Sequence, residues 1–145
     1  MTDSTIILAD LLTRLRAFLV DSGSVSYSDA SLTEAIRQAA GDLGRAYGKF
    51  VTIDDLDLAA ATNVDVLDVD LLLRGAAGYA ARMRAVDRAD SANLGQSMPA
   101  NLLEWSKNTL YWFDDKLKQV RLRLVQSSAG NPASQWTWDE SDKNW

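Results

Sequence analysis

The sequence predicts an all-α fold, a small bundle of about four helices within a chain of 145 residues. Apolar residues recur at three- and four-residue intervals in several long segments, and turn-forming residues separate these segments. Charged residues near the ends of one segment also have the signs that the helix dipole favours. A chain of this length buries roughly 70% of its extended surface on folding, so a hydrophobic core can form without disulfides or metals.

The first predicted helix covers about Ser4 to Asp21. Its apolar residues share one helical face: Ile7, Leu8, Leu11, Leu12, Leu15, Phe18 and Leu19. It ends in a cluster of turn-forming residues at 21–24, where Gly23 can adopt a positive φ.

The second predicted helix begins after Ser28, a suitable N-cap, and continues to about Tyr47. It contains Gly41, Gly44 and Gly48, each about 1 kcal/mol less favourable than alanine inside a helix. Either close packing against another backbone offsets this cost or the helix frays, and Gly48 alone is also a candidate C-cap.

Residues 49–66 interrupt the helical period with an irregular alternation of aliphatic and acidic residues, which predicts an extended loop or a short hairpin. A third helix is predicted from about Asp68 to Ser91, with aspartates at its start and arginines toward its end. Its middle is rich in alanine and contains Gly75 and Gly78, so a neighbouring helix can approach it closely.

The fourth predicted helix runs from Pro99, a residue suited to a first helical turn, to about Ser127. Apolar residues, among them Trp112, cover more than one of its faces, which makes this helix a candidate for a contact between subunits. Four cations lie close together near its end: Lys116, Lys118, Arg121 and Arg123. They complement the helix C-terminus or an acidic partner, or they form a stripe that contacts phosphates; the first reading is the commoner one.

Residues 128–145 show no helical or strand period and are polar and turn-rich. They nevertheless contain three of the five tryptophans of the chain: Trp136, Trp138 and Trp145. Tryptophan is disfavoured in solvated segments and enriched at binding hot spots. We therefore interpret 1–127 as a helical bundle domain and 128–145 as a flexible docking arm that orders on a partner.

The amino-acid composition excludes the residue types on which most catalytic mechanisms depend. The chain has no cysteine and no histidine, so it lacks thiolate nucleophiles, sulfur ligands and the usual general base near neutral pH. The aspartates between 54 and 70 do not have EF-hand spacing, and no glycine-rich phosphate loop occurs. We predict no enzymatic activity, catalytic residue, cofactor or metal; an enzyme built on Asp55, Asp57 and Asp68 is the weakest alternative.

The formal net charge is −5, so we expect no non-specific attraction to nucleic acid or to an anionic membrane. No apolar run approaches the length of a membrane span, and the first residues do not have the pattern of a signal peptide. These features predict a cytoplasmic protein that a signal peptide does not export.

Several segments together resemble head-to-tail adaptor proteins, also called connector or head-completion proteins, of tailed double-stranded DNA phages. The first segment is YSDASL (27–32), at the start of a predicted helix, and the Asp-rich break follows it. The others are LLLRGAAGYAARMRAVDRADSANLG (71–95) and Met98-Pro99, which a long predicted helix follows. The resemblance covers most of positions 5–125 as an arrangement of helices. The long aromatic arm departs from the shorter members of that family.

The resemblance implies a homo-oligomeric ring, commonly a dodecamer, that lies beneath the portal protein in the neck of the virion, next to tail or neck proteins, and is assembled in the host cytoplasm. DNA would pass through the ring without sequence-specific binding, and an acidic lining would not retain its phosphates. On this hypothesis, subunits pack through Gly41, Gly44, Gly75, Gly78 and Trp112, and the arm docks on the portal or a neighbour. The alternative is a small helical regulatory or inhibitor module that binds one protein partner.

Overall fold

The structure is a computed structural model that describes residues 6–20, 23, 26–91 and 97–127. Within these residues the fold is all-α, as the sequence predicts, and contains four α-helices and one short 3₁₀ helix but no named strand. The helices are α1 (Leu8–Phe18), α2 (Asp29–Tyr47), α3 (Val69–Ser91) and α4 (Ser97–Ser127), and the 3₁₀ helix η1 (Val66–Asp68) leads directly into α3.

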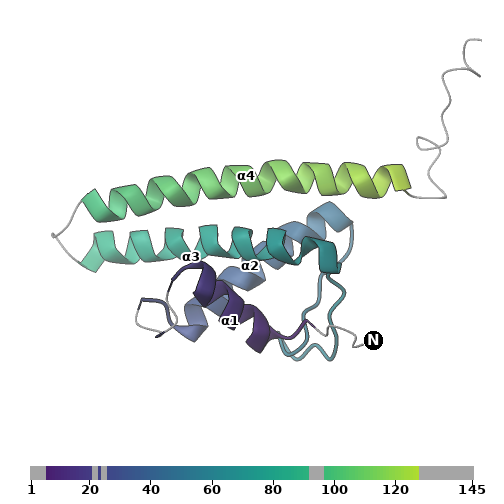
Figure 1. Cartoon of the computed structure of the whole chain (residues 1–145), viewed down its shortest axis with the longest axis horizontal. Coiled ribbons are helices and arrows are strands. Elements are labelled where there is room, and N and C mark those ends of the chain that lie inside the picture. The colour runs from purple at the N-terminus through teal and green to yellow at the C-terminus, as the bar shows by residue number, and fades with distance from the viewer. Residues whose placement is uncertain (1–5, 21–22, 24–25, 92–96, 128–145) are drawn as a thin grey trace, which may run out of the picture.

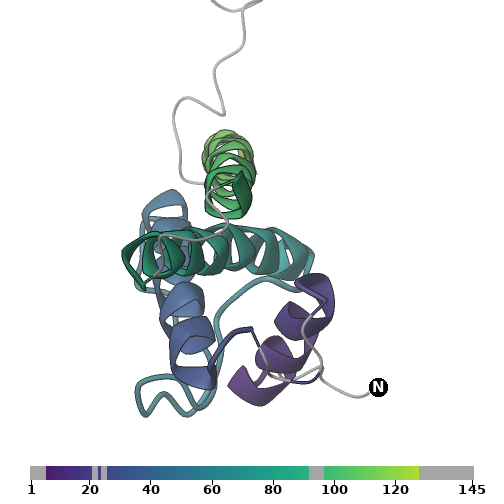
Figure 2. The same cartoon turned by 90° about the vertical axis from the view of Figure 1, so that its left-hand side faces the viewer.

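The third helix is the centre of the bundle. It packs against each of the other three α-helices, and its longest contact is an antiparallel pairing with α4 (Figure 1). Viewed end-on, α4 lies on one side of α3, while α1 and most of α2 lie on the opposite side; one end of α2 also contacts α4 (Figure 2). As a result, α4 uses only part of its circumference to pack on its own chain.

The ends of α1 and α2 follow local chemistry. At the start of α2, Ser28 accepts a hydrogen bond from the Ser31 amide at 3.1 Å, and at its end Gly48 adopts a φ of 72°. Both capping predictions are therefore confirmed. The first helix is shorter than predicted because Ile7 remains extended and forms a parallel bridge with Asp54, whose carbonyl accepts from the Leu8 amide at 3.0 Å.

The segment between α2 and η1 is an extended loop, one of the two predicted alternatives. Asn63 closes it: its side chain donates to the Phe50 carbonyl at 2.7 Å and accepts from the Thr52 amide at 2.8 Å. The loop turns its aliphatic residues inward, where Val51, Ile53 and Leu56 are buried. This burial explains why aliphatic residues alternate with acidic ones there without forming a sheet.

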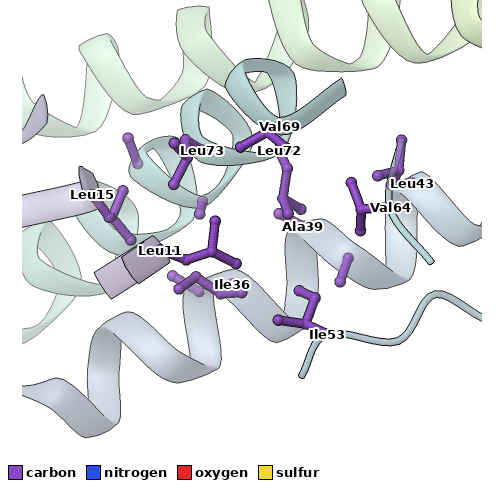
Figure 3. Close-up of a cluster of buried hydrophobic side chains, with 14 of the residues drawn as sticks. Leu11, Leu15, Ile36, Ala39, Leu43, Ile53, Val64, Val69, Leu72 and Leu73 are labelled. Carbon is purple, nitrogen blue, oxygen red and sulfur yellow. The ribbon is translucent and has the colours of Figure 1, made fainter. Parts of the chain in front are cut away.

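The main hydrophobic core lies between α1, α2, α3 and this loop (Figure 3). Leu11, Leu15 and Ile36 meet Leu72 and Leu73 of α3 in its centre. On the other side of α3, α4 contributes Phe113, Leu117 and Val120. Since both sides of α3 are covered, the buried alanines of its middle keep the two layers close together.

The glycines of α3 allow α4 to approach closely. A Cβ atom on Gly75 would lie 2.6 Å from the Phe113 ring, and one on Gly78 would lie 3.0 Å from Leu110. In α2, a Cβ on Gly44 would lie 2.9 Å from the Lys49 carbonyl oxygen, whereas one on Gly41 would meet nothing within 4 Å. Gly75, Gly78 and Gly44 therefore contribute to packing inside the chain, and their role in contacts between subunits stays a prediction.

Candidate protein interface

Trp112 lies at the edge of the α3–α4 pair and is partly exposed. The guanidinium carbon of Arg74 lies 5.2 Å from its ring centroid, and Lys116 Nζ lies at 5.9 Å. Arg74 also lies 5.9 Å from the Phe18 ring of α1, so it bridges two helices that make no packing contact of their own in the described part of the chain. Neither Arg74 nor Lys116 has a carboxylate partner among the described residues.

A groove of about 530 Å³ lies beside Trp112, between the start of α3 and the C-terminal half of α4. We call it the Trp112 groove, and its walls include Leu67, Leu71, Arg74, Trp112, Lys116 and Arg123. Leu67 is 78% exposed, and the adjacent Val66 is 62% exposed. The groove thus combines an aromatic side chain, exposed aliphatic residues and two cations, Arg74 and Lys116, that have no acidic partner among the described residues.

Asp68 forms the polar base of this groove. Its side chain is 3% exposed and accepts hydrogen bonds from Tyr47 Oη at 2.5 Å and from Arg123 Nη2 at 3.0 Å. Burial raises the pKa of the Tyr47 hydroxyl, and the bond to Asp68 raises it further. The hydrogen bond to Asp68 also raises the pKa of Arg123. This cluster joins α2, η1 and α4, so its primary effect is structural.

The four cations near the end of α4 do not form one stripe. Lys116 and Arg123 line the Trp112 groove, whereas Lys118 and Arg121 line a separate hollow of about 370 Å³ on the other side of α4. Lys118 also pairs with Asp114 at 3.5 Å. This division favours local pairing and contact with an acidic partner over a continuous phosphate-binding stripe.

Three of the six aspartates between 54 and 70 form ion pairs, namely Asp57, Asp68 and Asp70. Arg37 forms a two-bond contact with Asp57 at 2.8 and 2.9 Å, and it lowers the pKa of that carboxyl group. Arg14 pairs with Asp70 at 3.2 Å. Within the described residues no group of three or more acidic, histidine or cysteine side chains could hold a metal ion.

Tyr79 makes the stability of the bundle depend on pH in the alkaline range. Burial and a hydrogen bond to Asp42 raise the pKa of Tyr79 to about 12, above its ordinary value of 10.0. Because the folded chain holds this proton more tightly than the unfolded chain, the stability that Tyr79 contributes is fully present below about pH 10 and is lost as the pH rises toward 12. We expect the urea midpoint to fall across this interval, as measured by circular dichroism with tyrosinate absorbance in parallel.

A Tyr79→Phe variant provides the control for this pH dependence, because it removes the titrating hydroxyl and keeps the ring. Its urea midpoint should fall less between pH 10 and 12 than that of the parent chain. An identical pH profile for the two proteins would contradict the role of Tyr79.

The predicted site residues are only partly brought together. Trp112, Lys116 and Arg123 meet in the Trp112 groove, and Gly41 and Gly44 lie elsewhere, on α2. Trp136, Trp138 and Trp145 lie outside the described residues. Sequence reasoning missed Arg74, although it is the only charged residue between positions 71 and 81 and therefore stands out in an apolar run.

No protein-family model, curated protein or solved structure matches this chain. Within the described residues, no helix is both long enough and apolar enough to cross a membrane.

Proposed function

We propose that this chain is a structural subunit of a larger protein assembly, and specifically a head-to-tail adaptor that forms a ring between the portal and the tail of a phage. The Trp112 groove is the observation that carries this proposal. Its aromatic, aliphatic and cationic side chains form a continuous surface that the described part of the chain leaves uncovered. The helical resemblance supplies the class of assembly.

The composition of the groove suits a protein partner. Tryptophan and arginine are enriched at the energetic centres of protein interfaces, and Arg74 lies directly over Trp112. Leu67 adds an exposed aliphatic wall. Because Arg74 and Lys116 have no acidic partner among the described residues, the matching surface of the portal should present carboxylates near an apolar ridge.

The experiment measures attachment to the portal ring of the source phage by sedimentation and electron microscopy. The parent chain should bind as a multimeric ring, and the combined Arg74→Glu and Leu67→Ser substitutions should abolish attachment. Both positions are exposed, so helicity should be unchanged. Tyr111→Ser is the matched control, because Tyr111 is 73% exposed and lies outside the groove.

The number of chains in the complex distinguishes the adaptor from the alternative function, a regulatory or inhibitor module. A multimeric ring with the portal supports an adaptor. A one-to-one complex with some other protein, together with no attachment to the portal, would instead favour a regulatory or inhibitor module.

A further inference from the structure

A second groove lies on α2, away from the Trp112 groove. It has a volume of about 770 Å³ and runs between α2 and residues 49–59. Gly41, Gly44 and Gly48 form its smooth side on α2, and Val51, Ile53 and Leu56 lie on the loop side. We call it the α2–loop groove. Its size and mostly apolar lining are typical of a site that receives large side chains.

Two large apolar residues of this groove are solvent-exposed. Phe50 is 85% exposed and Leu58 is 100% exposed. Leu58 also has a φ of 67°, in the left-handed region that bulky residues seldom adopt. The adjacent Asp57 is held to α2 by its two hydrogen bonds with Arg37, which fixes this part of the loop. Leucine gains nothing at this position from packing or from backbone preference, so a binding role explains it better.

The rim of the groove is cationic. Lys49 has no carboxylate partner among the described residues; its amino group lies 5.8 Å from the Tyr47 ring centroid. Arg45 pairs with Asp42, but its side chain remains 83% exposed. Arg37 also lines the groove, but it pairs with both Glu34 and Asp57, so the available positive charge of the rim comes from Lys49 and the exposed Arg45. A matching ligand therefore presents aromatic or aliphatic groups together with negative charge.

The C-terminal segment 128–145 has this composition. Trp136 and Trp138 immediately precede Asp139 and Glu140, and the whole segment carries three carboxylate side chains and one lysine. Eight residues lie between Ser127, the last residue of α4, and Trp136, so the nine Cα-to-Cα steps allow a reach of up to about 30 Å. Its aromatic residues suit the apolar walls, and its carboxylates suit the cationic rim.

We propose that the α2–loop groove binds the tryptophan-bearing C-terminal segment of a second copy of this chain. This inference deepens the proposed function and rests on it, because it identifies how ring subunits are linked. Each chain contributes one segment and one groove, so the contact is heterologous. Such contacts close into a ring when the rotation between copies permits.

The first test measures binding of a fluorescently labelled peptide of residues 128–145 by anisotropy. The receptor is the full chain with Trp136→Ala and Trp138→Ala, which disables its own segment and leaves the groove intact. We expect saturable binding that weakens with added salt, because the rim charges are exposed. Adding Phe50→Ser and Leu58→Asn to the receptor should weaken binding about tenfold or more, since the contact loses two large apolar side chains.

Two controls test whether a loss of peptide binding comes from the groove itself. Phe50 and Leu58 are exposed, and asparagine accepts the left-handed backbone better than leucine, so the groove variant should fold normally. Leu122→Asn makes the same chemical change at another exposed position, on α4, and should leave the affinity unchanged. Absence of peptide binding, or binding that the groove substitutions do not weaken, would overturn the proposal.

The second test establishes that the segment binds a different copy. A groove variant (Phe50→Ser, Leu58→Asn) keeps an intact segment, and a segment variant (Trp136→Ala, Trp138→Ala) keeps an intact groove. Neither should associate alone, whereas an equimolar mixture should give one-to-one pairs by native mass spectrometry. A mixture that forms no pairs would overturn the contact. The parent chain, which has both parts intact, should form multimers in the same measurement; a parent chain that stays monomeric while the mixture forms pairs would show that the segment occupies its own groove and would overturn the inter-copy contact.

Failure of this inference is distinguishable from failure of the proposed function. Rings on the portal that persist in the groove variant would refute the contact and leave the adaptor function intact. Peptide binding and complementary pairing without attachment to the portal would support the contact and reject the adaptor function.

Discussion

Replacing Gly75 with alanine is expected to lower the free energy of unfolding by about 1–2 kcal/mol, although the same change stabilises most exposed helix interiors. The new Cβ atom would lie 2.6 Å from the buried Phe113 ring, so α3 and α4 must separate or the ring must leave its position. Overpacking of this kind costs about 1–3 kcal/mol, and improved helix propensity offsets up to about 1 kcal/mol of it. Urea unfolding followed by circular dichroism measures the difference.

Gly41→Ala is the matched control, since Gly41 also lies inside a helix but nothing lies within 4 Å of its added Cβ. We expect this variant to gain up to about 1 kcal/mol. A second variant, Gly75→Ala with Phe113→Leu, removes the clashing ring atoms and should cost less than the sum of its two single substitutions. Equal effects of alanine at positions 41 and 75 would show that α4 does not constrain Gly75.

The helices could be predicted because their signals are local. Ser28 and Gly48 limit α2 through hydrogen bonds and dihedral angles that depend on a few adjacent residues. The break at 49–66 can also be predicted, because its apolar residues do not recur at the three- and four-residue intervals of the flanking helices. The sequence pattern predicts a start of α1 that is too early, because Ile7 pairs with Asp54, a partner far away in the sequence.

The surfaces could be predicted only in part. Trp112 and Lys116 were recognised by residue type, but their association with Arg74 depends on how α3 and α4 pair. The small-residue pattern correctly indicated close helix approach. It could not distinguish a neighbour in the same chain from one in another copy, because both place similar demands on Gly75 and Gly78.

Replacing Asp68 with alanine is expected to lower the free energy of unfolding by about 2–3 kcal/mol. This change leaves the partly buried Tyr47 hydroxyl without its acceptor and removes the carboxylate that pairs with Arg123. Breaking a fully buried pair costs about 3–5 kcal/mol, but the Arg123 side chain is 43% exposed and water compensates part of the loss. Urea unfolding at neutral pH measures the effect.

Asp68→Asn separates charge from geometry, because its amide oxygen can still accept a hydrogen bond from Tyr47 while the attraction to Arg123 is lost. We expect a stability between those of the parent chain and Asp68→Ala. Asp115→Ala, on an exposed position of α4, should change stability by no more than about 0.5 kcal/mol. If Asp68→Ala behaved like Asp115→Ala, the cluster would not hold α4 to α2, and the base of the Trp112 groove would need another source of rigidity.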